Sequence, residues 1–180
     1  MADYPDTVEV SNGTTMTFKL QTRIVKIRGG PDDEVLQVPT HWHEHHDEII
    51  TVLEGQLKVT VGGKVKMCTS EDGGSFIPRG VPHALESLKG VPCVFTEQTR
   101  PLDDFSDRKE LFFRNTFAFP GGPMKAGLLP LLQVCHHGDT YFVFPIHFAW
   151  LEKAFVQILG RYIAPLLGYR LKYETLKKGS

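Results

Sequence analysis

The feature that most constrains how this chain folds is a series of short segments in which apolar and polar residues alternate between glycine and proline turns. Alternation with a period of two places the apolar side chains on one face of a β-strand. Clear examples are Thr15–Leu20, Leu57–Val61 and Lys64–Cys68, the last two joined by Gly62-Gly63. Further strands are expected over residues 23–27, 35–43, 49–53, 74–77, 83–88 and 92–96. Many short strands without a helical pattern predict an all-β sandwich or barrel.

Composition limits the partners and the compartment of the protein. With 41% hydrophobic residues in a chain of 180, a core can form without disulfides. Twenty Lys and Arg balance 21 Asp and Glu, which argues against a nucleic-acid binder that works through bulk charge. The three cysteines form no CxxC pair, and the first residues lack the basic and apolar regions of a signal peptide. We therefore expect a cytoplasmic protein.

Charge divides the chain into two parts. Residues 1–110 hold 12 Lys and Arg against 18 Asp and Glu, a net −6, whereas residues 111–180 hold 8 against 3, a net +5. The Pro-containing, highly charged stretch Thr99–Glu110 is typical of a boundary. We expect a barrel domain over residues 1–110 and an apolar, basic C-terminal extension over 111–180.

One segment carries the residue types of a metal site. In a strand, His41 and His43 point to the same face, while Trp42 points away. Residues 44–47 allow the chain to reverse, so that Glu48 on an antiparallel neighbour faces the same pocket. A third imidazole comes from His83, at a strand start after the Pro78-Arg79-Gly80 turn. Three imidazoles and one carboxylate suit Fe, Mn, Ni, Cu or Zn.

These spacings resemble the two sequence motifs of the cupin superfamily. The first motif, HxH followed by four residues, Glu, six residues and Gly, matches from His41 to Gly55 without a gap. The second, PxGxxH, matches from Pro78 to His83, although Ser87 stands where Asn is usual and the preceding glycine is displaced to Gly73. The resemblance implies an all-β cupin jelly-roll barrel with one divalent metal ion, Fe or Mn favoured, held by His41, His43, Glu48 and His83.

For four other histidines and one arginine, the sequence gives weaker evidence of a function. His45 and His46 are expected on a solvated reversal, with an extra ligand or a proton shuttle as the alternative. The pair His136-His137, beside a glycine, is expected in a loop. Arg79 is expected to face solvent, although a contact with an anionic substrate near the mouth stays open.

The expected chemistry follows from the ligand set and its surroundings. The ion would keep one or two open positions, and a wall of Ile50, Val52, Leu57 and Val59 would exclude water. We expect a metal-dependent enzyme acting on a small hydrophobic oxygenated metabolite, polyketide- or terpenoid-like, with Glu48 and His83 at the reacting centre. A dioxygenase-like oxidation is the favoured reaction. Non-redox decarboxylation, isomerisation or cyclisation through an enolate is the alternative, and a non-catalytic ligand-binding cupin is the third possibility.

The extension is rich in aromatic residues, since nine of the 12 Phe lie at or after Phe105. Apolar residues recur at three- and four-residue steps and predict a helix over Phe148–Ala164, stopped or kinked by Pro165. Charged residues interrupt every apolar run, so no membrane span is expected. Packing on the barrel or on the partner of a homodimer is favoured over peripheral contact with a membrane surface. This Phe-rich tail resembles those of small fungal secondary-metabolism cupins.

Overall fold

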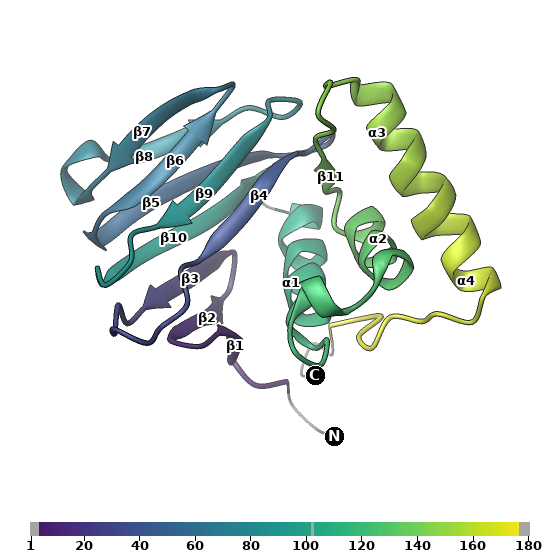
Figure 1. Cartoon of the computed structure of the whole chain (residues 1–180), viewed down its shortest axis with the longest axis horizontal. Helices are drawn as coiled ribbons and strands as arrows, with labels where there is room; N and C mark the ends of the chain where they lie inside the picture. The colour runs from purple at the N-terminus through teal and green to yellow at the C-terminus, as the bar shows by residue number, and fades with distance from the viewer. Residues whose placement is uncertain (1–3, 102, 177–180) are drawn as a thin grey trace.

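The computed structural model describes residues 4–101 and 103–176, and its first part is a sandwich of two antiparallel sheets (Figure 1). The larger sheet has the order β1 (Thr7–Ser11), β2 (Thr14–Lys19), β3 (Thr22–Ile27), β10 (Cys93–Arg100), β5 (Asp47–Gly55) and β8 (Gly74–Ile77). The smaller sheet has the order β11 (Tyr141–Phe142), β4 (Gln37–Trp42), β9 (His83–Ser87), β6 (Leu57–Val61) and β7 (Lys64–Cys68). The predicted all-β barrel with a mostly helical extension is confirmed.

The apolar faces of the two sheets form one core between them. Burial alternates along β5, where Ile50 and Val52 are 1% and 2% exposed, and along β6, where Leu57 and Val59 are 0% and 1% exposed. All four side chains predicted as an interior wall therefore face inward. They pack with the other members of the same cluster, Met16, Phe18, Val25, Ile27, Cys68, Ile77, Leu85, Cys93 and Phe95.

Two strands lie where no strand was predicted. Strand β1 pairs with β2 across the tight turn at Asn12-Gly13, where Gly13 has a φ of +84°. Strand β11 has two residues and belongs to the extension, and it pairs antiparallel with β4 through Tyr141↔Trp42 and Phe142↔His41. Because β4 ends in the predicted metal ligands, the extension is joined by backbone hydrogen bonds to the strand that carries them.

The extension consists of helices α1 (Asp103–Phe117), α2 (Leu128–His137), α3 (Ala149–Val156) and α4 (Ala164–Leu166), with a π-helical segment, Gln157–Ile163, between the last two. The helix predicted over Phe148–Ala164 is thus present, and Pro165 lies in its last turn. The prediction of a loop at His136-His137 is wrong, because both residues belong to the last turn of α2. The sheet ends at Arg100 and α1 starts at Asp103, so residue 110 lies inside a helix.

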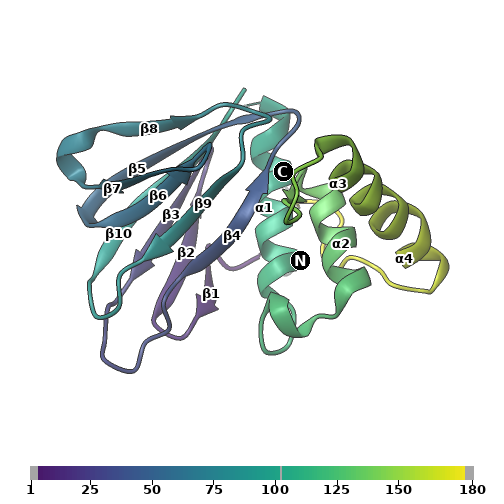
Figure 2. The same ribbon diagram turned by 45° about the horizontal axis from the view of Figure 1, so that its top comes forward.

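The helices gather on one side of the barrel, with α1 nearest the strands and α3 further out (Figure 2). Trp42 points away from the barrel interior, as predicted, and its ring stacks on Tyr141 with centroids 4.6 Å apart. A second apolar cluster surrounds this contact and includes Leu132, Cys135 and Val156. Within the described residues, no helix is long and apolar enough to cross a bilayer.

The position of His136 predicts a loss of stability in acid. Burial, followed by the charges of His137 and Arg161, lowers the pKa of His136 from 6.5 to about 4. Between these values the unfolded chain binds a proton that the folded chain does not, so stability is complete above pH 6.5 and falls as the pH drops toward 4. His136 can lower the free energy of unfolding by at most about 1.4 kcal/mol per pH unit, and its partial exposure to solvent reduces this effect.

Between pH 7 and pH 5, the free energy of unfolding should decrease by about 1 kcal/mol less in His136→Asn than in the parent protein. Urea unfolding at the two pH values measures this difference. The matched control is His45→Asn, at an exposed position outside this helix. Equal pH dependence in the parent protein and His136→Asn would contradict the assignment.

Candidate metal centre

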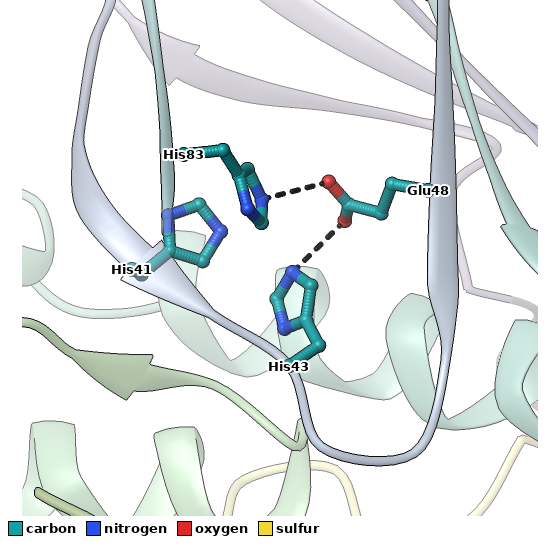
Figure 3. Close-up of side chains that lie close together, drawn as sticks. All are labelled: His41, His43, Glu48 and His83. Carbon is teal, nitrogen blue, oxygen red and sulfur yellow. Dashed lines mark hydrogen bonds and ion pairs between the residues drawn. The ribbon is translucent and has the colours of Figure 1, made fainter. Parts of the chain in front are cut away.

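Four side chains predicted to act together meet at one end of the sandwich (Figure 3). His41 lies on β4, His43 follows that strand, His83 begins β9, and Glu48 reaches across from β5 in the opposite sheet. Glu48 Oε1 is 3.2 Å from His43 Nε2, and Glu48 Oε2 is 3.1 Å from His83 Nε2. One ligand atom from each of the four residues lies within 4.8 Å of the others, and no side chain is more than 7% exposed.

Backbone carbonyls orient all three imidazoles. His41 Nδ1 lies 2.9 Å from the Pro39 carbonyl, His83 Nδ1 lies 3.0 Å from the Val81 carbonyl, and His43 Nδ1 lies 2.6 Å from the Asp139 carbonyl. Because a carbonyl oxygen only accepts, each Nδ1 carries the proton and donates it. A neutral ring held in this way keeps its lone pair on Nε2, the form in which imidazole binds a metal.

The protonation states of the cluster fit a divalent cation. Apart from its 3.2 Å contact with Glu48 Oε1, the buried His43 Nε2 has no polar partner among the described residues. Burial lowers the pKa of His41 well below its ordinary value, and burial with the nearby Lys109 charge lowers that of His43. Burial alone would raise the pKa of Glu48, but His43, His83 and Lys109 offset it and hold that pKa well below its usual range. Neutral imidazoles and an ionised carboxylate are what a bound divalent metal requires.

Comparison with known proteins supplies the family. A family model described as a cupin domain matches residues 34–98, a range that includes all four clustered residues. This chain contains a cupin domain. The chain resembles "Probable oxidoreductase yanE" of Aspergillus niger, with 28% identity over 145 residues that cover 73% of this chain and 55% of the relative. It also resembles "Probable oxidoreductase patJ" of Penicillium expansum, with 26% identity over 141 residues that cover 73% and 43%.

The cupin thus spans about half the length of the curated relatives it matches. Among solved structures, it is similar to KdgF from Halomonas sp., with a TM-score of 0.42 and 22% identity over 56% of this chain and 90% of that one. The polyketide cyclase RemF from Streptomyces resistomycificus gives a TM-score of 0.40 and 23% identity over 51% of this chain and 68% of that one.

The extension places a lysine beside the four clustered residues of the cupin. Lys109 projects from α1 and is 2% exposed, with its Nζ 3.9 Å from Glu48 Oε1. Its Nζ also donates a hydrogen bond to Thr140 Oγ1 at 3.3 Å. Burial lowers the pKa of Lys109, and the negative charges of Glu48 and Glu97 act in the opposite direction. Sequence analysis missed Lys109 because it lies in the charged stretch that was assigned to a boundary.

The interior of the cupin near Glu48 is not purely apolar. Arg23 on β3 and Glu97 on β10 are 2% and 6% exposed, and Arg23 Nε lies 3.5 Å from Glu97 Oε1. Burial and then the charge of Glu48 raise the pKa of Glu97 to about 7. The apolar wall predicted from β5 and β6 is real, but a buried ionisable pair on β3 and β10 completes the interior. Alternation places both side chains in the inward rows of their strands.

The reversal between His43 and Glu48 differs from its prediction. His45 is exposed, as expected, but His46 is fully buried and its ring stacks on that of His43 at a centroid distance of 4.2 Å. The expectation of a solvated His46 is wrong because the extension covers this side of the loop. Arg79 keeps a half-exposed side chain, and it donates to the Asp47 carboxylate and to the His45 carbonyl.

Proposed function

We propose that this cupin is a metal-dependent enzyme that oxidises a small hydrophobic oxygenated metabolite in a dioxygenase-like reaction. The observation that carries the proposal is the buried set of three Nε2 lone pairs and one carboxylate at His41, His43, His83 and Glu48. A redox-active ion such as Fe or Mn would be held by this set and would supply the electron transfer that oxidation of a substrate oxygen centre by dioxygen needs. Zn, Ni or Cu would fit the same donors.

The names of the relatives support oxidation over other cupin chemistry. Both curated relatives are fungal and are named probable oxidoreductases. The resemblance of the Phe-rich tail to small fungal secondary-metabolism cupins favours a polyketide- or terpenoid-like substrate.

Residues around the cluster would bind and orient such a substrate. Ile50 and Val52 extend inward from Glu48 along β5, so they would hold the apolar part and exclude water. The Lys109 ammonium, close to Glu48, would face an anionic oxygen of the substrate. Glu48 is ionised and would be a proton acceptor, and His83, whose Nε2 lies 3.1 Å from Glu48 Oε2, would hold the same ion beside it.

A non-redox reaction is the second candidate, favoured by the proton-transfer groups beside the cluster. Lys109 and Glu97 are both buried near Glu48, and Glu97 has a pKa of about 7. Groups of this kind suit decarboxylation, isomerisation or cyclisation, in which protons move without an external oxidant.

Metal analysis and oxygen consumption separate these reactions. Protein purified without chelators should contain about one divalent ion per chain. Iron or manganese, with oxygen consumed in proportion to the turnover of catechol-like or enolic compounds, would support oxidation. Turnover that continues without oxygen would favour the non-redox reaction. Full metal loading without turnover of any compound tested would favour a ligand-binding protein.

A substitution at Lys109 tests the substrate contact. Lys109→Met keeps a long apolar stem and removes the charge, so we expect kcat/KM to fall about 100-fold while the metal content is retained. Steady-state kinetics and elemental analysis give both values. The control is Lys153→Met, which removes a partly exposed lysine that pairs with Glu44. If Lys109→Met turned over substrate at the parent rate, the ammonium would have no role in binding it.

A further inference from the structure

Asp139 contacts the loop between the candidate ligands at four points, although it lies more than ninety residues away in the chain. Its backbone carbonyl accepts from His43 Nδ1 at 2.6 Å. Its carboxylate accepts from the backbone N–H of Glu44 at 3.2 Å and of His45 at 2.8 Å. The same carboxylate also lies 2.8 Å from His46 Nδ1. One residue of the extension thus holds four consecutive residues of the cupin domain.

The surrounding structure fixes where Asp139 stands. It occupies the turn between α2 and β11 with a φ of +52°, a left-handed conformation that Asp, Asn and Gly tolerate better than other residues. The preceding Gly138 lies against Phe112 of α1, and a Cβ there would be 2.2 Å from the ring. Asp139 is 5% exposed. Packing of the two helices therefore sets the position of its carbonyl and carboxylate.

The charge of Asp139 suits this task. Burial would raise the pKa of Asp139, but hydrogen bonds from His46 and from the backbone of His45 and Glu44 lower it below its ordinary value. An ionised carboxylate accepts all three donors at once, and hydrogen bonds to a charged acceptor are stronger than neutral ones. The loop that separates His43 from Glu48 is thereby held in one arrangement.

We propose that Asp139 is a positioning residue for the metal centre, which it serves by orienting His43 and by ordering residues 44–47. The inference rests on metal binding at the four clustered residues, and it is independent of which reaction follows. A group that orients a ligating imidazole through its second nitrogen typically changes metal affinity by about 10- to 100-fold. The extension would then be part of the metal site as well as a cover on the barrel.

The test uses Asp139→Asn and Asp139→Gly in the full chain. Both residues tolerate the positive φ, so the backbone carbonyl stays available to His43. Asn retains the shape but replaces one acceptor oxygen with an amide donor that faces another donor. Gly removes the whole carboxylate. The control is Asp33→Asn, because Asp33 is buried to a similar extent, at 4% exposed, and its carboxylate holds a turn through Gly30 N–H and Arg28 and not through any clustered residue.

Metal affinity and the visible spectrum of Co²⁺-loaded protein are the readouts, with urea unfolding measured in parallel. Without the hold of the carboxylate on residues 44–46, His43 is less firmly kept against the Asp139 carbonyl, so we expect Asp139→Asn to bind Co²⁺ about 10-fold more weakly in chelator competition and to shift the ligand-field bands. Asp139→Gly should lose at least as much affinity. Asp33→Asn should lose stability but keep both the affinity and the spectrum.

Affinity within twofold of the parent in both folded Asp139 variants would overturn the inference, as would an equal affinity loss in Asp33→Asn. Either result leaves the proposed function standing if the parent binds Co²⁺ and His83→Ala does not. A parent protein that fails to bind Co²⁺ at this cluster would overturn both proposals together.

Discussion

Replacing His83 with alanine should leave the purified protein with less than about a tenth of an ion per chain. The substitution removes one of the three proposed imidazole ligands, the one whose Nε2 lies 3.1 Å from Glu48 Oε2. Loss of a direct ligand should cost more affinity than loss of an orienting group, so we expect a decrease of at least about 100-fold. Elemental analysis and chelator competition measure the occupancy and the affinity.

The fold itself should survive this substitution. His83 begins β9, but the apolar core formed by both sheets lies along the strands beyond it. His45→Ala is the control, because His45 is exposed and lies in the segment that carries His41, His43 and Glu48. Full metal occupancy in folded His83→Ala would remove His83 from the ligand set, and occupancy lost equally in His45→Ala would point to a different site.

The centre of the site was predictable because short-range geometry determines most of it. A period of two places His41 on β4 and His43, which directly follows β4, on one face, and the same period aligns Glu48 with Ile50 and Val52 on β5. The Pro-Gly turn delivers His83 to the start of β9. Register then brings His41 opposite His83. Each step needs only strand pairing and a turn, which the local sequence encodes.

The surroundings of the site were not predictable because they depend on contacts between distant segments. Lys109 lies in a stretch whose charges indicate exposure, yet α1 carries it to within 3.9 Å of Glu48. Asp139 stands beside a glycine like many loop residues, and its four contacts are all with residues 43–46. In the sequence, nothing distinguishes His46 from the exposed His45, and only the contact with the extension buries it. No periodicity in either segment records these pairings, so only the tertiary structure shows that the barrel and the extension share one site.

Glu152 is the residue of the extension whose loss should have the largest effect on stability. It is fully buried on α3, and its Oε2 accepts a hydrogen bond from Trp42 Nε1 at 2.7 Å. Its Oε1 accepts the Phe144 N–H at 2.9 Å, and His147 Nδ1 lies 3.0 Å from Oε2. Burial would raise the pKa of Glu152, but these hydrogen bonds lower it, so the carboxylate is ionised.

Glu152→Ala should therefore lower the free energy of unfolding by about 3 kcal/mol, because it leaves the indole N–H and a backbone N–H buried without an acceptor. Urea denaturation measures the change. Glu86→Ala is the control, since Glu86 forms an exposed ion pair with Lys58 on the barrel and should cost less than about 1 kcal/mol.

Tryptophan fluorescence shows whether the loss in Glu152→Ala comes from separation of the extension. The chain has two tryptophans, and Trp150 is 72% exposed, so Trp150→Phe leaves Trp42 as the reporter. In that background, we expect the emission of Trp42 to shift to longer wavelength in Glu152→Ala at urea concentrations where the barrel is still folded. The shift is expected because Tyr141 of the extension shields the Trp42 ring from solvent, and separation of the extension would expose that ring. An unchanged emission maximum together with a stability loss below 1 kcal/mol would show that apolar packing alone, through Leu132, Tyr141 and Val156, holds the extension on the strand that bears the ligands.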